Sequence, residues 1–127
     1  MADSVLLFGW GVPIPGRETK ALQVFGEAVE YFARLERDGR IEGMEPMLLE
    51  EHGGDLGGFF LIRGDHDGLA GLRGDDEFQR MVARAGLVVS NVGVVAGMTG
   101  ERLQRLMAMW QEQVAELAEP AAMTAHA

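Results

Sequence analysis

The middle of the chain, from Ile41 to Gly64, contains two short apolar runs joined by a stretch that includes the sequence GGDLGG. Two such runs flanking several glycines can pair antiparallel, because glycine adopts the positive φ values that a tight bend needs. We therefore expect a β-hairpin with strands over Met44–His52 and Phe59–Arg63. Since Pro46 lacks the N–H that a central ladder requires, the first of these strands should lie at a sheet edge.

Further apolar runs and helical patterns flank this hairpin. Val5–Trp10 lacks the alternation of a half-exposed strand, which indicates burial on both faces, and Leu87–Ala96 is a β-branched run that predicts a last strand. Helical periodicity extends from Arg17 to Asp38, and acidic residues open a shorter helix that ends at Gly86. Asp65–Leu72 is interpreted as a connection with one possible helical turn.

Two of the predicted helices carry an apolar stripe. In the helix over residues 17–38 the stripe consists of Leu22, Phe25, Val29, Phe32 and Leu35. A last helix can be capped by Thr99 and is expected to end at Pro120, and its stripe consists of Leu103, Leu106, Met107, Trp110, Val114 and Leu117.

The order of these elements is β, α, β, β, α, β, followed by a terminal helix, and this order matches the split βαβ or ferredoxin-like plan. A right-handed crossover leaves a gap between the first two strands, and the hairpin brings the third strand into that gap. We thus predict an α+β domain over residues 1–118 with a four-stranded antiparallel sheet, whose first and third strands are central. Residues 119–127 are expected to form a flexible C-terminal tail.

The strands carry more apolar surface than two helices can cover. Helices cover one face of such a sheet, yet residues of both parities are apolar, for example Leu6 and Phe8 against Val5 and Leu7. Monomers tolerate only a few hundred Å² of contiguous exposed apolar surface, so something must cover the second face. Another copy of the chain is the simplest cover, and a homodimer through the sheet faces is expected.

In element order and strand apolarity, the segment Val5–Leu117 resembles the dimeric α/β-barrel superfamily, in which two ferredoxin-like sheets pack face to face. The resemblance points to the YciI-like or uncharacterised small-protein branch of that superfamily. It implies a fold and a dimer, and since the chain contains no catalytic motif specific to one family, it implies no functional residues.

Composition excludes several classes of function. The chain has 127 residues and no cysteine, which excludes disulfides, thiolate catalysis and cysteine-based metal sites. The net charge is −9, with 20 acidic and 11 scattered basic residues, so nucleic acid is not an expected partner. No apolar stretch approaches the roughly 18 to 20 residues needed to cross a bilayer, and we expect a cytoplasmic protein with no membrane partner.

Motifs for phosphate, metal or cofactor binding are incomplete. Gly9, Gly11 and Gly16 lack the spacing of GxGxxG, since Ile14 stands where a glycine is required. Asp65 and Asp67 resemble the start of a calcium loop whose later ligands do not follow. We therefore predict no metal and no cofactor.

Polar groups within or beside the apolar strands are the candidate ligand-binding residues: Trp10, Arg63, Asn91, His52 and His66. Burying a polar group without a partner costs about 1–3 kcal/mol, so groups of this kind have a partner or face a cavity. In the predicted last strand Ser90 and Asn91 have opposite parity, and one of them should face the helices. The alternative is that these groups only satisfy backbone or dimer hydrogen bonds. The histidines bracket the hairpin without having to meet, and solvated side chains are the simpler interpretation for them.

Two hypotheses for the function follow. The first is a protein that binds a small apolar molecule, or a cofactor-independent enzyme, with a pocket between sheet and helices or inside the dimer. The second is a non-catalytic homodimeric assembly domain, in which strand apolarity serves only dimerisation. The discriminating observation is a cavity beside the candidate residues.

Overall fold

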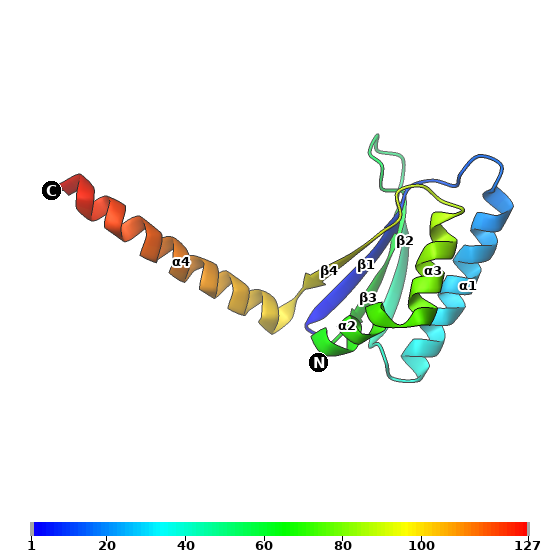
Figure 1. Ribbon diagram of the computed structural model, residues 1–127, viewed down its shortest axis with the longest axis horizontal. Coiled ribbons are helices and arrows are strands. Elements are labelled where there is room, and N and C mark those ends of the chain that lie inside the picture. The colour runs from blue at the N-terminus through cyan, green and yellow to red at the C-terminus, as the bar shows by residue number, and fades with distance from the viewer. Residues whose placement is uncertain (1, 127) are drawn as a thin grey trace.

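The computed structural model describes residues 2–126 and forms one layer of helices against one sheet, with a helix that extends away from both (Figure 1). The elements in chain order are β1 (Ser4–Trp10), α1 (Glu18–Arg37), β2 (Gly43–Leu48), β3 (Gly58–Gly64), α2 (His66–Gly74), α3 (Asp76–Gly86), β4 (Gly93–Met98) and α4 (Gly100–His126).

The four strands form an antiparallel sheet in the order β2-β3-β1-β4. The predicted order is confirmed: β1 and β3 are central, and β2, which contains Pro46, lies at an edge. Leu7 is the partner of Leu61 on β3 and of Val95 on β4, so these three side chains share one face. Leu6 and Phe8 therefore point to the opposite face.

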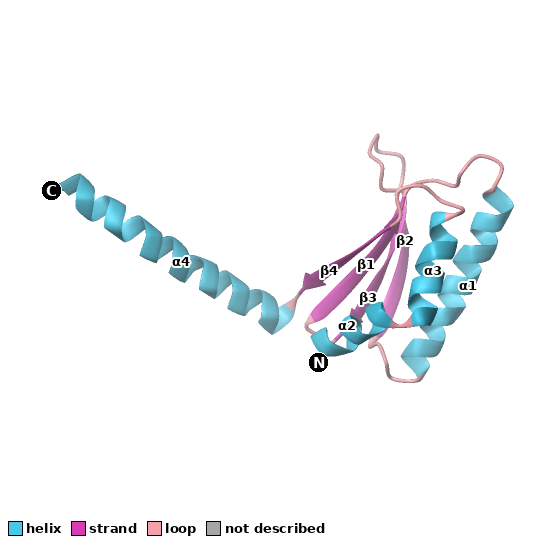
Figure 2. Cartoon of the chain, in the orientation of Figure 1, coloured by secondary structure: helices cyan, strands magenta, loops and turns pink. Residues whose placement is uncertain are grey.

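That opposite face is covered by the helices and forms the core. Helices α1 and α3 lie side by side along it, and α2 lies near one end of the sheet (Figure 2). Phe8 is at the centre, with edge-on ring contacts to Phe32, Phe60 and Phe78 at centroid distances of 6.0–6.4 Å. Aromatic pairs prefer this geometry, because the positive ring edge then meets the negative ring face.

The buried stripe of α1 is rotated from the predicted one. Leu22 is 75% exposed, whereas Ala21, Val24, Ala28 and Tyr31 are buried. The prediction about Leu22 was wrong because it favoured large side chains, while alanine lets the helix approach the sheet closely. Ion pairs from α1 to α3, Glu27 with Arg84 and Arg34 with Glu77, then form across the exposed edge of the two helices.

Two predictions about the middle of the chain are corrected. The first hairpin strand ends at Leu48 and not at His52, because residues 49–57 form a longer loop that the amide of Leu49 closes by donating to the carbonyl of Gly57 at 2.9 Å. The segment Asp65–Leu72 largely forms the helix α2, since packing of Leu69 and Leu72 in the core outweighs its glycine content.

The last strand begins at Gly93 and not at Leu87. Residues 88–90 pair with residues 11–14, and the amide of Gly11 donates to the carbonyl of Ser90 at 2.7 Å. Asn91 then has a φ of 53°, a left-handed conformation that ends the extended segment. Ser90 and Asn91 are therefore outside the sheet, and the predicted alternation of their side chains across it was wrong.

The expected helix end at Pro120 is wrong, since α4 continues to His126. That residues 119–127 form a flexible tail stays a prediction. Proline inside a helix removes one backbone donor and its ring clashes with the preceding turn, but it can kink a helix without ending it. None of the helices in residues 2–126 combines the length and the apolarity that a bilayer crossing requires.

The face of the sheet away from α1 and α3, here called the outer sheet face, is mostly apolar, carries Arg63 and Glu45 as charged residues, and is covered by no helix of the described chain (Figure 2). Val95 on this face is 62% exposed and Met47 is 40% exposed. The predicted excess of apolar strand surface is thus present. It consists of Val5, Leu7, Met47, Phe59, Leu61 and Val95.

Candidate functional site

A cleft of about 520 Å³ opens between the N-terminal half of α1, the end of β1 and the loops next to them. Trp10, Phe25 and Phe60 line this cleft and are here called the aromatic wall. The Trp10 ring centroid lies 4.9 Å from that of Phe60 and 5.9 Å from that of Phe25. The remaining lining is mostly apolar: Phe8, Gly11, Val12, Pro13, Glu18, Ala21, Leu22, Val24, Ala28, Leu48, Leu49, Glu51, Gly57, Met81, Ala85, Val88 and Val89.

Contact between two glycines shapes the entrance of the cleft. The amide of Gly57 donates to the carbonyl of Trp10 at 2.7 Å, and a Cβ at position 57 would lie 1.9 Å from the carbonyl oxygen of Gly11. Only glycine permits so close an approach of two backbones. The hairpin loop is thereby held against the end of β1, with Leu49 and Glu51 at the cleft.

The polar groups of the cleft are few. The indole N–H of Trp10 makes no hydrogen bond to the described part of the chain, so it is a free donor at the aromatic wall. Glu18 and Glu51 supply carboxylate acceptors, and Glu18 also accepts from the amide of Gly16 at 3.3 Å. The lining contains no lysine, arginine or histidine. The cleft therefore suits an uncharged, largely apolar molecule better than an anion.

The structure does not bring the five predicted residues together. Of these five residues, only Trp10 lines the cleft. Arg63 is exposed on the outer sheet face, where its Nη1 lies 3.7 Å from Oε1 of Glu45 on the neighbouring strand. Asn91 is exposed in the connection between α3 and β4.

The two histidines lie beyond opposite ends of β3. His52 stabilises the hairpin loop, since its Nδ1 accepts from the amide of Gly54 at 3.2 Å and its Nε2 donates to the carbonyl of Leu56 at 2.7 Å. His66 is the first residue of α2 and lines a second cavity. Among the side chains of residues 2–118, no group of three or more histidine or acidic residues is placed to hold a metal ion.

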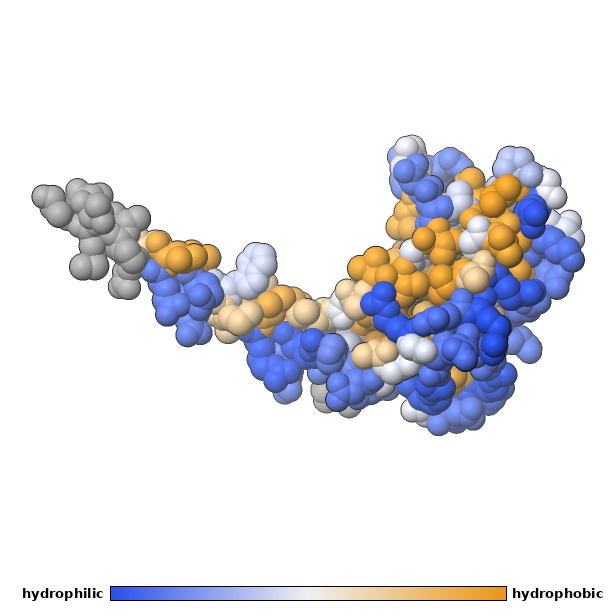
Figure 3. Space-filling view, in the orientation of Figure 1, coloured by the Kyte–Doolittle hydropathy of each residue, from blue (hydrophilic) through white to orange (hydrophobic). Residues whose placement is uncertain are grey.

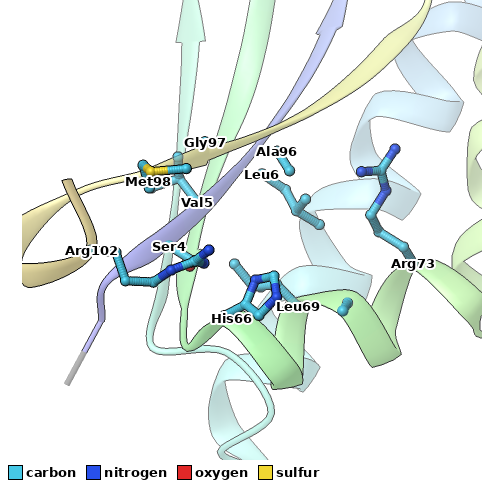
Figure 4. A pocket seen from close by; sticks show the side chains of 11 residues that line it. Ser4, Val5, Leu6, His66, Leu69, Arg73, Ala96, Gly97, Met98 and Arg102 are labelled. Atoms are coloured by element: carbon cyan, nitrogen blue, oxygen red, sulfur yellow. The ribbon is translucent and has the colours of Figure 1, made fainter. Parts of the chain in front are cut away.

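The second cavity has a volume of about 270 Å³ and lies between β1, β4 and α2 (Figure 4). Arg102 reaches over Ser4 beside His66, and Arg73 lies on the far side of Leu6 (Figure 4). The arginines are already bonded, since Arg102 donates to Oγ of Ser4 at 2.6 Å and Arg73 donates to the carbonyl of Val94 at 3.3 Å. These bonds hold the start of α4 and the strand β4, so the larger cleft is the better candidate for ligand binding.

Sequence reasoning missed Phe25, Glu18 and Glu51 as cleft residues. Phe25 was assigned to the apolar stripe of the helix over residues 17–38, and the two glutamates carried no pattern that marked them. The available signal was the loop of residues 11–16, whose glycines and prolines mark a break between β1 and α1 and whose first residues line the cleft.

Comparison with solved structures identifies the fold. A dimeric protein of unknown function with a ferredoxin-like fold from Bacteroides fragilis NCTC 9343 aligns over 75% of this chain and 95% of its own, with a TM-score of 0.55 and 13% identity. The chain has a ferredoxin-like fold. A conserved protein from Methanosarcina mazei Go1 aligns over 77% of this chain and 94% of its own, with a TM-score of 0.54 and 10% identity.

A third similar structure is SnoaB, a cofactor-independent oxygenase from Streptomyces nogalater. It aligns over 78% of this chain and 95% of its own, with a TM-score of 0.50 and 18% identity. No protein-family model matches the chain, and no curated protein matches it in sequence. The predicted ferredoxin-like fold is thus confirmed, whereas the YciI-like branch stays a prediction.

Proposed function

We propose that this protein binds a small, uncharged and largely apolar molecule in the cleft between α1 and the end of β1. The observation that carries the proposal is a volume of about 520 Å³ lined by the aromatic wall and free of cationic side chains. Volumes of 300–1,000 Å³ with apolar walls and a few polar groups are typical of small-molecule sites. The indole N–H of Trp10 supplies the donor that would orient such a molecule.

A cofactor-independent reaction on the bound molecule is the enzymatic form of this proposal. SnoaB, which is similar in fold, is a cofactor-independent oxygenase. Catalysis by side chains in this cleft would depend on the carboxylates of Glu18 and Glu51 and on the indole of Trp10, because no histidine or lysine lines it. The other predicted ligand-binding residues, Arg63, Asn91, His52 and His66, have no part in this proposal.

A neutral fluorescent probe, N-phenyl-1-naphthylamine, tests the cleft. Titration of the full chain should give saturable binding, and Ala28→Phe should weaken it at least tenfold, because the new ring would fill space beside the aromatic wall. The matched control is Ala33→Phe on the same helix, since Ala33 does not line the cleft. Far-UV circular dichroism establishes that both variants are folded.

Unchanged affinity of folded Ala28→Phe for the probe would contradict the proposal. A loss of probe binding in Val95→Glu would also contradict it. The second result would locate the probe on the outer sheet face. No saturable binding to the unmodified chain would also contradict it.

The second candidate is a non-catalytic homodimer formed through the outer sheet face. The observation in its favour is the exposed apolar side chain of Val95 on a sheet face that no helix covers. The similar protein from Bacteroides fragilis is dimeric. Dimerisation and ligand binding use different surfaces of this chain, so both can hold together.

A further inference from the structure

Helix α4 is amphipathic over residues 100–118 and extends away from the rest of the molecule (Figure 3). Its apolar residues recur at helical spacing from Leu103 to Leu117, and Glu101, Arg105, Glu112 and Glu116 lie on the opposite side. Exposure of the apolar side chains rises from 42% at Leu103 to 61% at Trp110 and 77% at Leu117. An exposed stripe of this kind is costly in water unless another surface covers it.

The start of α4 is fixed in a direction that leads away from its own sheet. The amide of Thr99 donates to the carbonyl of Asp3 at 3.0 Å, and Arg102 donates to Oγ of Ser4 at 2.6 Å. Gly100 between them has a φ of 56°, a conformation that favours glycine. Folding α4 back onto its own sheet would require the bond from Arg102 to Ser4 to break, so the stripe has no partner among the described residues of its own chain.

The outer sheet face is the complementary surface. It presents Leu7, Phe59, Leu61 and Val95. Leu56 of the hairpin loop lies beside this face, since a Cβ added at Gly9 would be 3.0 Å from Cδ1 of Leu56. An amphipathic helix that lays its apolar side on such a surface is a recurrent mode of recognition. One chain thus carries both an unpartnered helix and an unpartnered face.

We propose that α4 of each chain packs on the outer sheet face of a second copy. This inference rests on the proposed homodimer and adds that the partner's helix is part of the interface. The apolar stripe from Leu103 to Leu117 spans 15 residues, about 22 Å, and the seven residues of β1 span about 23 Å, so the stripe matches the length of a partner's strand. Reciprocal exchange covers both helices and both faces, and the assembly closes at two copies.

Sedimentation velocity and light scattering of the full chain test this exchange. The unmodified protein should have twice the chain mass of 13.8 kDa, and Trp110→Glu on α4 and Val95→Glu on the outer sheet face should each give folded monomers. Leu87→Glu is the matched control, because Leu87 is 63% exposed and lies outside both surfaces. It should remain dimeric.

The emission of Trp110, taken as the difference between the unmodified chain and Trp110→Phe, separates exchange from folding back. We expect blue-shifted emission in the dimer that shifts to the red on dilution to monomers. A monomer with blue-shifted Trp110 emission at every concentration would mean that α4 covers its own sheet, and would overturn the inference.

Trp110→Glu and Val95→Glu together distinguish the exchange of α4 from dimerisation through the outer sheet face. A dimeric Trp110→Glu beside a monomeric Val95→Glu would retain the sheet-face dimer and overturn the exchange of α4. A dimeric Val95→Glu, or an unmodified chain that is monomeric, would overturn both.

Discussion

Tyr31 in α1 is a buried polar residue whose hydroxyl has no hydrogen-bond partner within residues 2–126. Burial raises its pKa to about 12, and the nearby charges of Glu77 and Asp75 act in the same direction. Removing an unsatisfied hydroxyl removes its desolvation cost, so Tyr31→Phe should leave the free energy of unfolding unchanged or raise it by about 1 kcal/mol. Urea unfolding near neutral pH measures this difference.

The same residue predicts a loss of stability in alkaline solution. An unfolded chain releases the tyrosine proton near its ordinary pKa of 10.0, whereas the folded chain keeps it until about 12. The contribution of Tyr31 to the free energy of unfolding is therefore fully present below pH 10 and is lost as the pH rises toward 12. The free energy of unfolding of Tyr31→Phe should lack this decline. Because the chain has one tyrosine, tyrosinate absorbance reports on this residue alone. Ionisation near pH 10 in the folded protein would contradict the prediction.

At the scale of elements, glycines in a helix and in a loop should respond in opposite ways to the same substitution. Gly26 lies inside α1 with no atom within 4 Å of an added Cβ, so Gly26→Ala should raise stability by about 0.5–1 kcal/mol. At Gly57 the added Cβ would meet the backbone of Gly11 at 1.9 Å, so Gly57→Ala should lower stability by about 2 kcal/mol or more.

Parallel urea titrations of the two glycine variants and the unmodified chain check this contrast. The affinity for N-phenyl-1-naphthylamine should fall in Gly57→Ala, since the hairpin loop forms part of the cleft entrance, and should not change in Gly26→Ala. Equal stability of the two variants would show that the loop does not approach the end of β1 as closely as described.

For the whole molecule, the proposed dimer predicts an unfolding temperature that depends on protein concentration. Dimers that dissociate on unfolding gain stability by mass action, so the midpoint should rise with concentration in the unmodified chain. In Trp110→Glu the midpoint should be lower and independent of concentration, and Leu87→Glu should behave like the unmodified chain. Differential scanning calorimetry over a dilution series measures this, and a constant midpoint in the unmodified chain would contradict it.

The sequence by itself determined the order of the strands along the chain and their position in the sheet. Pro46 identified an edge strand, and the apolar residues of both parities around Leu7 and Leu61 indicated a second face that the helices leave bare. These features depend on local periodicity and on the chemistry of single residues, and both can be read along the chain.

Only the tertiary structure decided the site. Residues 88–90 pair with residues 11–14 and not with the sheet, and α2 forms because Leu69 and Leu72 reach the core. The predicted polar residues consequently lie at separate places, and only Trp10 reaches the cleft. The close approach of Gly57 to Gly11 and the direction of α4 depend on contacts between residues distant in sequence, which local patterns do not encode.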